Sequence, residues 1–123
     1  MENIRLEVIP EDNQGVPVIR FSGEIDVYTV PMFKKAIYEA IDSGKKHIVV
    51  DLSNVSYMDS SGFGTLLGAT KRLRPVGGSL SLVGCNDVIT RMLKITRLDT
   101  IFRMHPSEAD AVNTILSGTN QNP

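Results

Sequence analysis

The chain has 123 residues, of which 41% are hydrophobic and 22% are charged, and its formal net charge is −1. This composition is ordinary for one globular domain that buries a core, and a net charge near zero supplies no field to attract nucleic acid or anionic lipid. No apolar run is long enough to span a bilayer, and the N-terminus lacks the pattern of a signal peptide. The single cysteine, Cys85, excludes an internal disulfide and fits a reducing compartment. We therefore expect one cytoplasmic domain that contacts neither nucleic acid nor a membrane.

The first half of the chain predicts a hairpin, a helix and a buried strand. Apolar and polar residues alternate over residues 4–9, as in a half-exposed strand, and residues 16–21 are its expected partner after a turn at 10–15. Apolar residues recur at helical spacing over residues 30–41. The nearly unbroken apolar run at 48–52 is typical of a strand buried on both faces, as in a sheet with crossover helices.

The second half continues this alternation of strands and helices. We expect helices that begin near residues 59–61, Asn86 and Ser107, strands over residues 79–83 and 101–104, and a frayed tail over residues 117–123. The predicted fold class is α/β, with a mixed, mostly parallel sheet of four to five strands packed against about four helices. The domain itself is expected to span residues 4–116.

The polar residues at the start of the second helix carry the strongest functional signal. They follow a short polar loop after the strand at 48–52, and apolar residues recur at helical spacing from Phe63 onward, so Asp59, Ser60 and Ser61 are left at the helix N-terminus. Free backbone N–H groups and the helix dipole favour negative charge there, so a serine at this place is suited to carry a phosphate. Capping is the ordinary role of such residues, but it needs only one side chain, either Asp59 or Ser60. In both cases we expect the Ser61 hydroxyl to be free.

Three glycines lie within the same helix. The spacing G-x-G-x-x-x-G at Gly62, Gly64 and Gly68 is one residue longer than a dinucleotide-binding fingerprint, so we expect no nucleotide-cofactor fold and no cofactor. Each glycine costs a helix about 1 kcal/mol relative to alanine. We expect that these glycines allow the helix to approach either the sheet or another protein closely.

A second polar cluster, Gly23, Glu24 and Asp26, follows the second predicted strand. A turn with solvated acids explains these residue types. Loops that follow neighbouring strands of an α/β sheet can nevertheless lie side by side, so Asp26 is a candidate neighbour of Ser61.

No group of residues predicts catalysis. His47, His105 and Cys85 are dispersed without the spacing of metal ligands, and no serine lies in a G-x-S-x-G elbow. Cys85 follows an apolar strand and is expected to be a small core or strand-end residue. The basic residues of the predicted helices are Lys71, Arg72, Arg74, Arg91, Lys94 and Arg97. A solvated face explains them better than nucleic-acid binding.

Two segments resemble a known family. Residues 55–64, Val-Ser-Tyr-Met-Asp-Ser-Ser-Gly-Phe-Gly, and residues 21–26, Phe-Ser-Gly-Glu-Ile-Asp, closely resemble the bacterial anti-sigma factor antagonists, which are single STAS domains. The resemblance extends over about residues 4–116. In that family the unmodified domain binds an anti-sigma factor that is also a serine kinase with a histidine-kinase-like ATPase fold, and this binding releases the sigma factor. Phosphorylation of the serine in a D-S-S/T-G motif breaks the complex, and a PP2C-type phosphatase restores it.

The resemblance implies that Ser61 is the phosphoacceptor, with Ser60 as the alternative because hydroxyls occupy both positions. The implied partner-binding residues are Gly23, Glu24, Asp26, Asp59, Ser60, Gly62, Phe63 and Gly64. The chain is then expected to be a monomeric regulator of transcription with no catalytic activity of its own. The main alternative is a constitutive STAS scaffold subunit of a stress-signalling complex that is never phosphorylated.

Overall fold

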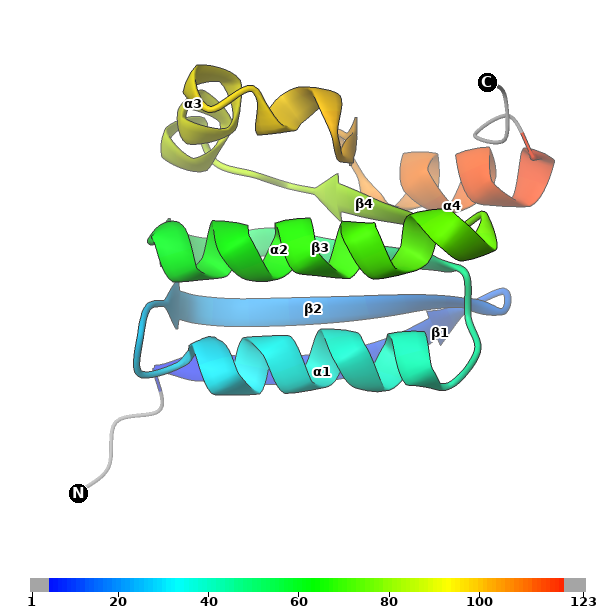
Figure 1. Cartoon of the computed structure of the whole chain (residues 1–123), viewed down its shortest axis with the longest axis horizontal. Helices are drawn as coiled ribbons and strands as arrows, with labels where there is room; N and C mark the ends of the chain where they lie inside the picture. The colour runs from blue at the N-terminus through cyan, green and yellow to red at the C-terminus, as the bar shows by residue number, and fades with distance from the viewer. Residues whose placement is uncertain (1–4, 119–123) are drawn as a thin grey trace.

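The computed structural model describes residues 5–118, in which an opening hairpin is followed by alternating helices and strands. The strands are β1 (Leu6–Asn13), β2 (Val16–Ile25), β3 (His47–Met58), β4 (Ser79–Val83) and β5 (Arg103–His105), and they lie in this order across one sheet. β1 pairs antiparallel with β2, and every other pair of neighbours is parallel. The predicted mixed, mostly parallel sheet is therefore confirmed (Figure 1).

Four α-helices cover this sheet: α1 (Val30–Asp42), α2 (Ser60–Leu73), α3 (Asp87–Ile95) and α4 (Glu108–Ser117). Figure 1 shows α1 and α2 side by side across one face of the sheet, and α4 packs against the other face. Two single 3₁₀ turns, Arg74–Val76 and Leu98–Thr100, follow α2 and α3. The caps of α3 and α4 are those predicted, because Asn86 accepts a hydrogen bond from Ile89 N and Ser107 accepts one from Asp110 N.

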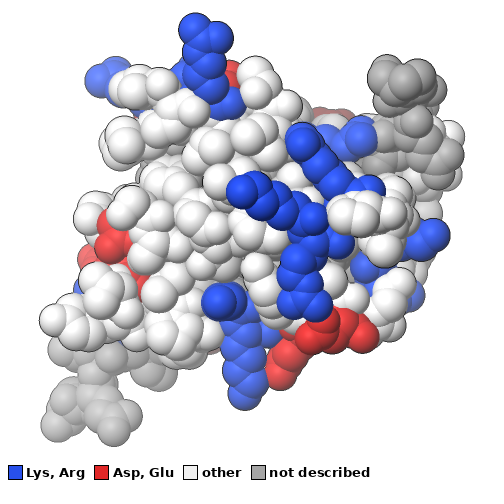
Figure 2. All heavy atoms as spheres, in the orientation of Figure 1, with Lys and Arg blue, Asp and Glu red and all other residues white. Residues whose placement is uncertain are grey.

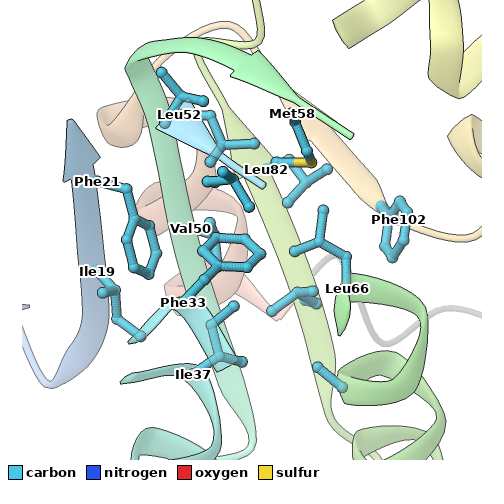
Figure 3. Close-up of a cluster of buried hydrophobic side chains, with 14 of the residues drawn as sticks. Ile19, Phe21, Phe33, Ile37, Val50, Leu52, Met58, Leu66, Leu82 and Phe102 are labelled. Atoms are coloured by element: carbon cyan, nitrogen blue, oxygen red, sulfur yellow. The ribbon is translucent and has the colours of Figure 1, made fainter. Parts of the chain in front are cut away.

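The central strand β3 explains why the sheet has a core on each face. Its side chains alternate, so Ile48, Val50 and Leu52 face α1 and α2, whereas Val49 packs with Val112 of α4. Figure 3 shows the larger of the two cores, where Phe33 and Ile37 of α1 and Leu66 of α2 meet the sheet. The predicted burial of β3 on both faces is confirmed.

Three strands are longer than predicted. β1 continues to Asn13, so the hairpin turn is only Gln14–Gly15, both with positive φ (57° and 89°), and the prediction of a turn over residues 10–15 is wrong. Pro10 is tolerated within β1 because β1 is an edge strand, where a missing N–H leaves no neighbour unpaired. Ile4 and residues 119–123 of the predicted tail lie outside the described residues, and Ser117 is the last residue of α4 rather than part of a tail.

β2 and β3 also run further than their apolar segments. β2 continues from the predicted end at residue 21 to Ile25, and β3 continues through the predicted polar loop to Met58. Two register shifts in their pairing accommodate this extension. Because Ile25 pairs with Met58, the segments that follow the two strands start next to each other.

Candidate functional site

The first turn of α2 is organised by one carboxylate. Asp59 is the N-cap residue, and its Oδ1 accepts a hydrogen bond from Ser61 N at 2.9 Å. The Ser61 hydroxyl donates to the same oxygen. The prediction of a cap at this position is confirmed, but the expectation of a free Ser61 hydroxyl is wrong, because the cap holds both the backbone and the side chain of Ser61.

The start of α2 is fixed against the sheet by close packing. Asp59 N donates to Ile25 O at 3.0 Å, and a Cβ placed on Gly62 would lie 2.5 Å from Met58 Cγ and 2.9 Å from Ile25 Cγ2. Gly62 is therefore the glycine at which the helix approaches the sheet. Gly64 is exposed, with no atom within 4 Å of an added Cβ, so its open side faces solvent.

The side chains of this turn differ in exposure. Phe63 is only 8% exposed and packs in the core, so it fixes the first turn of α2 against the sheet. Ser60 is exposed, and Asp59 and Ser61 are half-buried. The turn thus presents Ser60, the edge of Ser61 and Gly64 to a molecule approaching from solvent.

The second predicted cluster lies at the end of β2. Gly23 and Glu24 are residues of β2, so the prediction of a turn at these two positions is wrong. Gly23 has φ +125°, and a Cβ there would lie 2.0 Å from Arg5 O, so this backbone position requires glycine. The Glu24 carboxylate forms an ion pair with Arg5 at 3.0 Å.

Asp26 organises the loop between β2 and α1. Its Oδ1 accepts hydrogen bonds from Tyr28 N at 2.9 Å and from Thr29 N at 3.1 Å, and its other carboxylate oxygen pairs with Arg5. Burial opposes the charged form, but the hydrogen bonds from Thr29 and Tyr28 and the charge of Arg5 prevail and hold the pKa of the Asp26 carboxyl below its usual range. Asp26 is therefore an ionised structural group of this loop.

The two clusters lie at neighbouring strand ends, as expected, because Asp26 follows Ile25 and Asp59 follows its paired residue Met58. No hydrogen bond joins Asp26 to Ser61 among residues 5–118. The two loops therefore share a surface without sharing contacts between these side chains.

The sequence interpretation missed exposed apolar side chains around this surface. Tyr28 is 80% exposed, Val27 63% and Tyr57 50%, at the ends of β2 and β3. Strand alternation could not have indicated this for Tyr57, because Val55 and Met58 are both buried although they lie three positions apart. Such clustered apolar exposure is typical of surfaces that bind another protein.

Other chemistry is sparse in the described part of the chain. Residues 5–118 contain no cluster of three His, Cys, Asp or Glu side chains suited to hold a metal ion, and none of their helices is long and apolar enough to span a membrane. Burial raises the pKa of the Cys85 thiol to about 11, so this cysteine is a poor nucleophile.

Comparisons with known proteins agree with this geometry. The family model described as the STAS domain matches residues 7–111. The chain is 33% identical over 113 residues to the anti-sigma F factor antagonist of Paenibacillus polymyxa, covering 91% of this chain and 97% of that protein. It is 36% identical over 110 residues to the anti-sigma-B factor antagonist of Staphylococcus aureus, covering 89% and 98%.

A solved structure has the same fold. The Bacillus cell fate determinant SpoIIAA in its phosphorylated form superposes with a TM-score of 0.70 at 26% identity, over 89% of this chain and 99% of that one. The family model covers most of the chain, both relatives are named as anti-sigma factor antagonists, and the solved structure has the same fold. The chain therefore belongs to the STAS domain family and, within it, to the bacterial anti-sigma factor antagonists.

Proposed function

We propose that this anti-sigma factor antagonist is switched off by phosphorylation of Ser61. Antagonists of this family are regulatory binding proteins and not enzymes, so the switch must act on binding. The observation that carries the proposal is the Ser61 hydroxyl held on Asp59 at the N-terminus of α2, within a surface of exposed apolar residues. The similarity to a protein solved in a phosphorylated form supports it.

The binding state requires no change in the chain as described. The exposed surface is mostly uncharged and is formed by Ser60, Gly64, Tyr28 and Tyr57. The acidic side chains around it form ion pairs with Arg5 or accept hydrogen bonds. In the proposal the partner is an anti-sigma factor that is a serine kinase with a histidine-kinase-like ATPase fold. Binding of this partner frees its sigma factor in the cytoplasm, and the antagonist acts as a monomer.

Phosphorylation changes two interactions of Ser61. The hydroxyl proton that Asp59 accepts is lost, and a group of about −1.5 to −2 charges is placed near the Asp59 carboxylate. Repulsion between the two groups drives the phosphate outward, where the free N–H groups and the dipole of α2 stabilise it. The fold is expected to persist because Phe63 and Gly62 still anchor the turn.

The partner, in contrast, meets an uncompensated charge at the interface. Such a charge typically costs about 2–5 kcal/mol, which weakens binding by about two to three decades or more. The complex with the kinase therefore dissociates, and a PP2C-type phosphatase resets the antagonist by removing the phosphate.

The test is incubation of the full chain with ATP and the anti-sigma kinase from the same genome, read by intact mass and by size-exclusion chromatography. Matched variants are Ser61→Ala and Ser60→Ala. We expect one phosphate on the wild type and on Ser60→Ala, and none on Ser61→Ala. We also expect that only the modified protein loses the complex. Phosphate on Ser61→Ala would move the acceptor to Ser60. Stable binding without any phosphate transfer would instead indicate a constitutive scaffold.

A further inference from the structure

The end of the sheet opposite to Ser61 contains a pocket of about 460 Å³. It lies between the C-terminal end of α2, the start of β4 and the segment that enters β5. β5 begins with Arg103 opposite Ser81, so Ser79 and Leu80 at the start of β4 have no strand beside them on that side. The late start of the edge strand therefore creates the pocket, and its volume is typical of small-molecule sites.

The pocket is lined by positive charge. Arg74 and Arg103 line it, and neither guanidinium forms an ion pair with a carboxylate among residues 5–118. The pKa of His47, whose Nδ1 lies 2.8 Å from Ser79 Oγ in the pocket wall, is lowered by burial and by the charges of Arg103 and Lys46. Figure 2 shows Lys and Arg side chains gathered over the second half of α2.

A buried hydroxyl in the pocket wall has no partner. Thr70 is only 4% exposed, and its Oγ1 has no hydrogen bond in the structure. Two other threonines bond back to the preceding turn: Thr65 of α2 donates to Ser61 O at 3.0 Å, and Thr96, the residue after α3, donates to Met92 O at 2.7 Å. An unpaired buried hydroxyl destabilises the folded chain, so Thr70 has a polar group that the fold itself does not use.

We propose that this pocket binds a small organic phosphate, such as a nucleoside monophosphate. Two arginine forks and one hydroxyl match the several acceptor oxygens and the double charge of a phosphate monoester. Leu80 and Phe102 form an apolar part of the wall, against which the organic part of the ligand packs. This site is distinct from Ser61 and does not depend on the proposed phosphorylation.

The test is a titration of the ¹⁵N-labelled full chain, followed by backbone amide shifts at constant ionic strength. The probes are inorganic phosphate, AMP and, as a neutral control, adenosine. We expect saturable shifts confined to residues around the pocket, with AMP binding at least tenfold more tightly than inorganic phosphate or adenosine. Equal affinities of AMP and inorganic phosphate would contradict the role given to Leu80 and Phe102.

Matched variants separate a site from diffuse attraction. Arg74→Gln and Arg103→Gln are expected to weaken AMP binding at least tenfold. Arg72→Gln should change AMP binding less than twofold, because Arg72, near the end of α2 and two residues before Arg74, is paired with Asp42 at 2.9 Å. An equal loss in Arg72→Gln, or shifts that spread over all basic residues without saturation, would overturn the proposal.

Thr70 provides a second, independent readout. Thr70→Val keeps the shape of the side chain, so it is expected to raise the midpoint of thermal unfolding by about 2–5 °C while weakening AMP binding severalfold. Ser81→Ala is the control, because the Ser81 hydroxyl is also buried and unpartnered but does not line the pocket. It should raise the midpoint without changing AMP binding. Unchanged AMP binding by Thr70→Val would contradict the assignment.

Discussion

At the carboxyl ends of β2 and β3 each acidic side chain of the candidate site has a partner, whereas at the opposite end of the sheet Arg74 and Arg103 have none within the described chain. The first surface is electrostatically complete and becomes disturbed only when charge is added. The arginines of the second surface are paired only when a ligand supplies negative charge. In the two proposals, covalent modification therefore controls the first surface and ligand binding controls the second.

The largest expected effect is on the first surface. Ser61→Asp adds a permanent negative charge where a partner packs and is expected to weaken binding of the anti-sigma factor by about two decades. Isothermal titration with the cognate anti-sigma factor would measure it. Arg103→Gln, at the opposite end of the sheet, should leave this affinity within threefold of the wild-type value. Equal effects of the two substitutions would remove the distinction between the ends.

A second prediction concerns the backbone that shapes the first surface. Gly23→Ala should lower the free energy of unfolding by about 2–4 kcal/mol, because the new Cβ meets Arg5 O and φ is +125°. Gly64→Ala is the matched control, since its added Cβ has open space and alanine favours a helix by about 1 kcal/mol. Urea unfolding measures both. A Gly23→Ala protein as stable as the wild type would show that β2 needs no glycine here.

A smaller effect is expected at the cap of α2. Asp59→Ala should destabilise the unmodified chain by about 0.5–2 kcal/mol, whereas Asp59→Asn retains an oxygen for Ser61 N and should cost only a few tenths of a kcal/mol. After phosphorylation, Asp59→Asn should lose less stability than the wild type, because the like charge beside the phosphate is gone. Thermal unfolding of both phosphorylated proteins checks this. A larger loss in Asp59→Asn would exclude repulsion between the two groups.

The smallest effect is the pH dependence contributed by Asp26. Its folded pKa is lowered, so ionised Asp26 stabilises the fold above the unfolded pKa of about 3.9, and this stability is lost as the pH falls through the folded pKa. Asp26→Asn lacks this dependence. Urea unfolding at several pH values between 7 and 2 should therefore show the wild type losing its advantage over the variant below about pH 4. Parallel pH profiles would contradict an ion pair between Asp26 and Arg5 that matters for stability.

The sequence predicted the features that depend on local periodicity and capping. The buried strand β3, the start of α2 and the caps Asn86 and Ser107 follow from patterns within a few residues. The extension of β3 through residues 53–58 could not be predicted in this way, because pairing with β2, through two register shifts, determines it. The polar residues 53–58 read as a loop when β3 is considered alone, but pairing with β2 keeps them in the strand.

The contacts of the site depended even more on distant residues. Arg5 pairs with Glu24 and Asp26 across 19 and 21 positions, and no local pattern indicates this. The Ser61 hydroxyl was expected to be free because one cap uses one acceptor bond, whereas a carboxylate oxygen has room for two donors. The pocket at the opposite end depends on where β5 begins, which is set by pairing with β4.

α2 joins the two ends of the molecule as one unbroken helix of 14 residues, about 20 Å long. Its first turn carries Ser61, and its last turns carry Thr70 and lead into Arg74. A rigid helix transmits a tilt at one end to the other, so occupancy of the pocket and docking of the anti-sigma factor are thermodynamically linked whenever either one shifts α2. Linkage is reciprocal: the factor by which a bound anion changes affinity for the anti-sigma factor equals the factor by which the anti-sigma factor changes affinity for the anion.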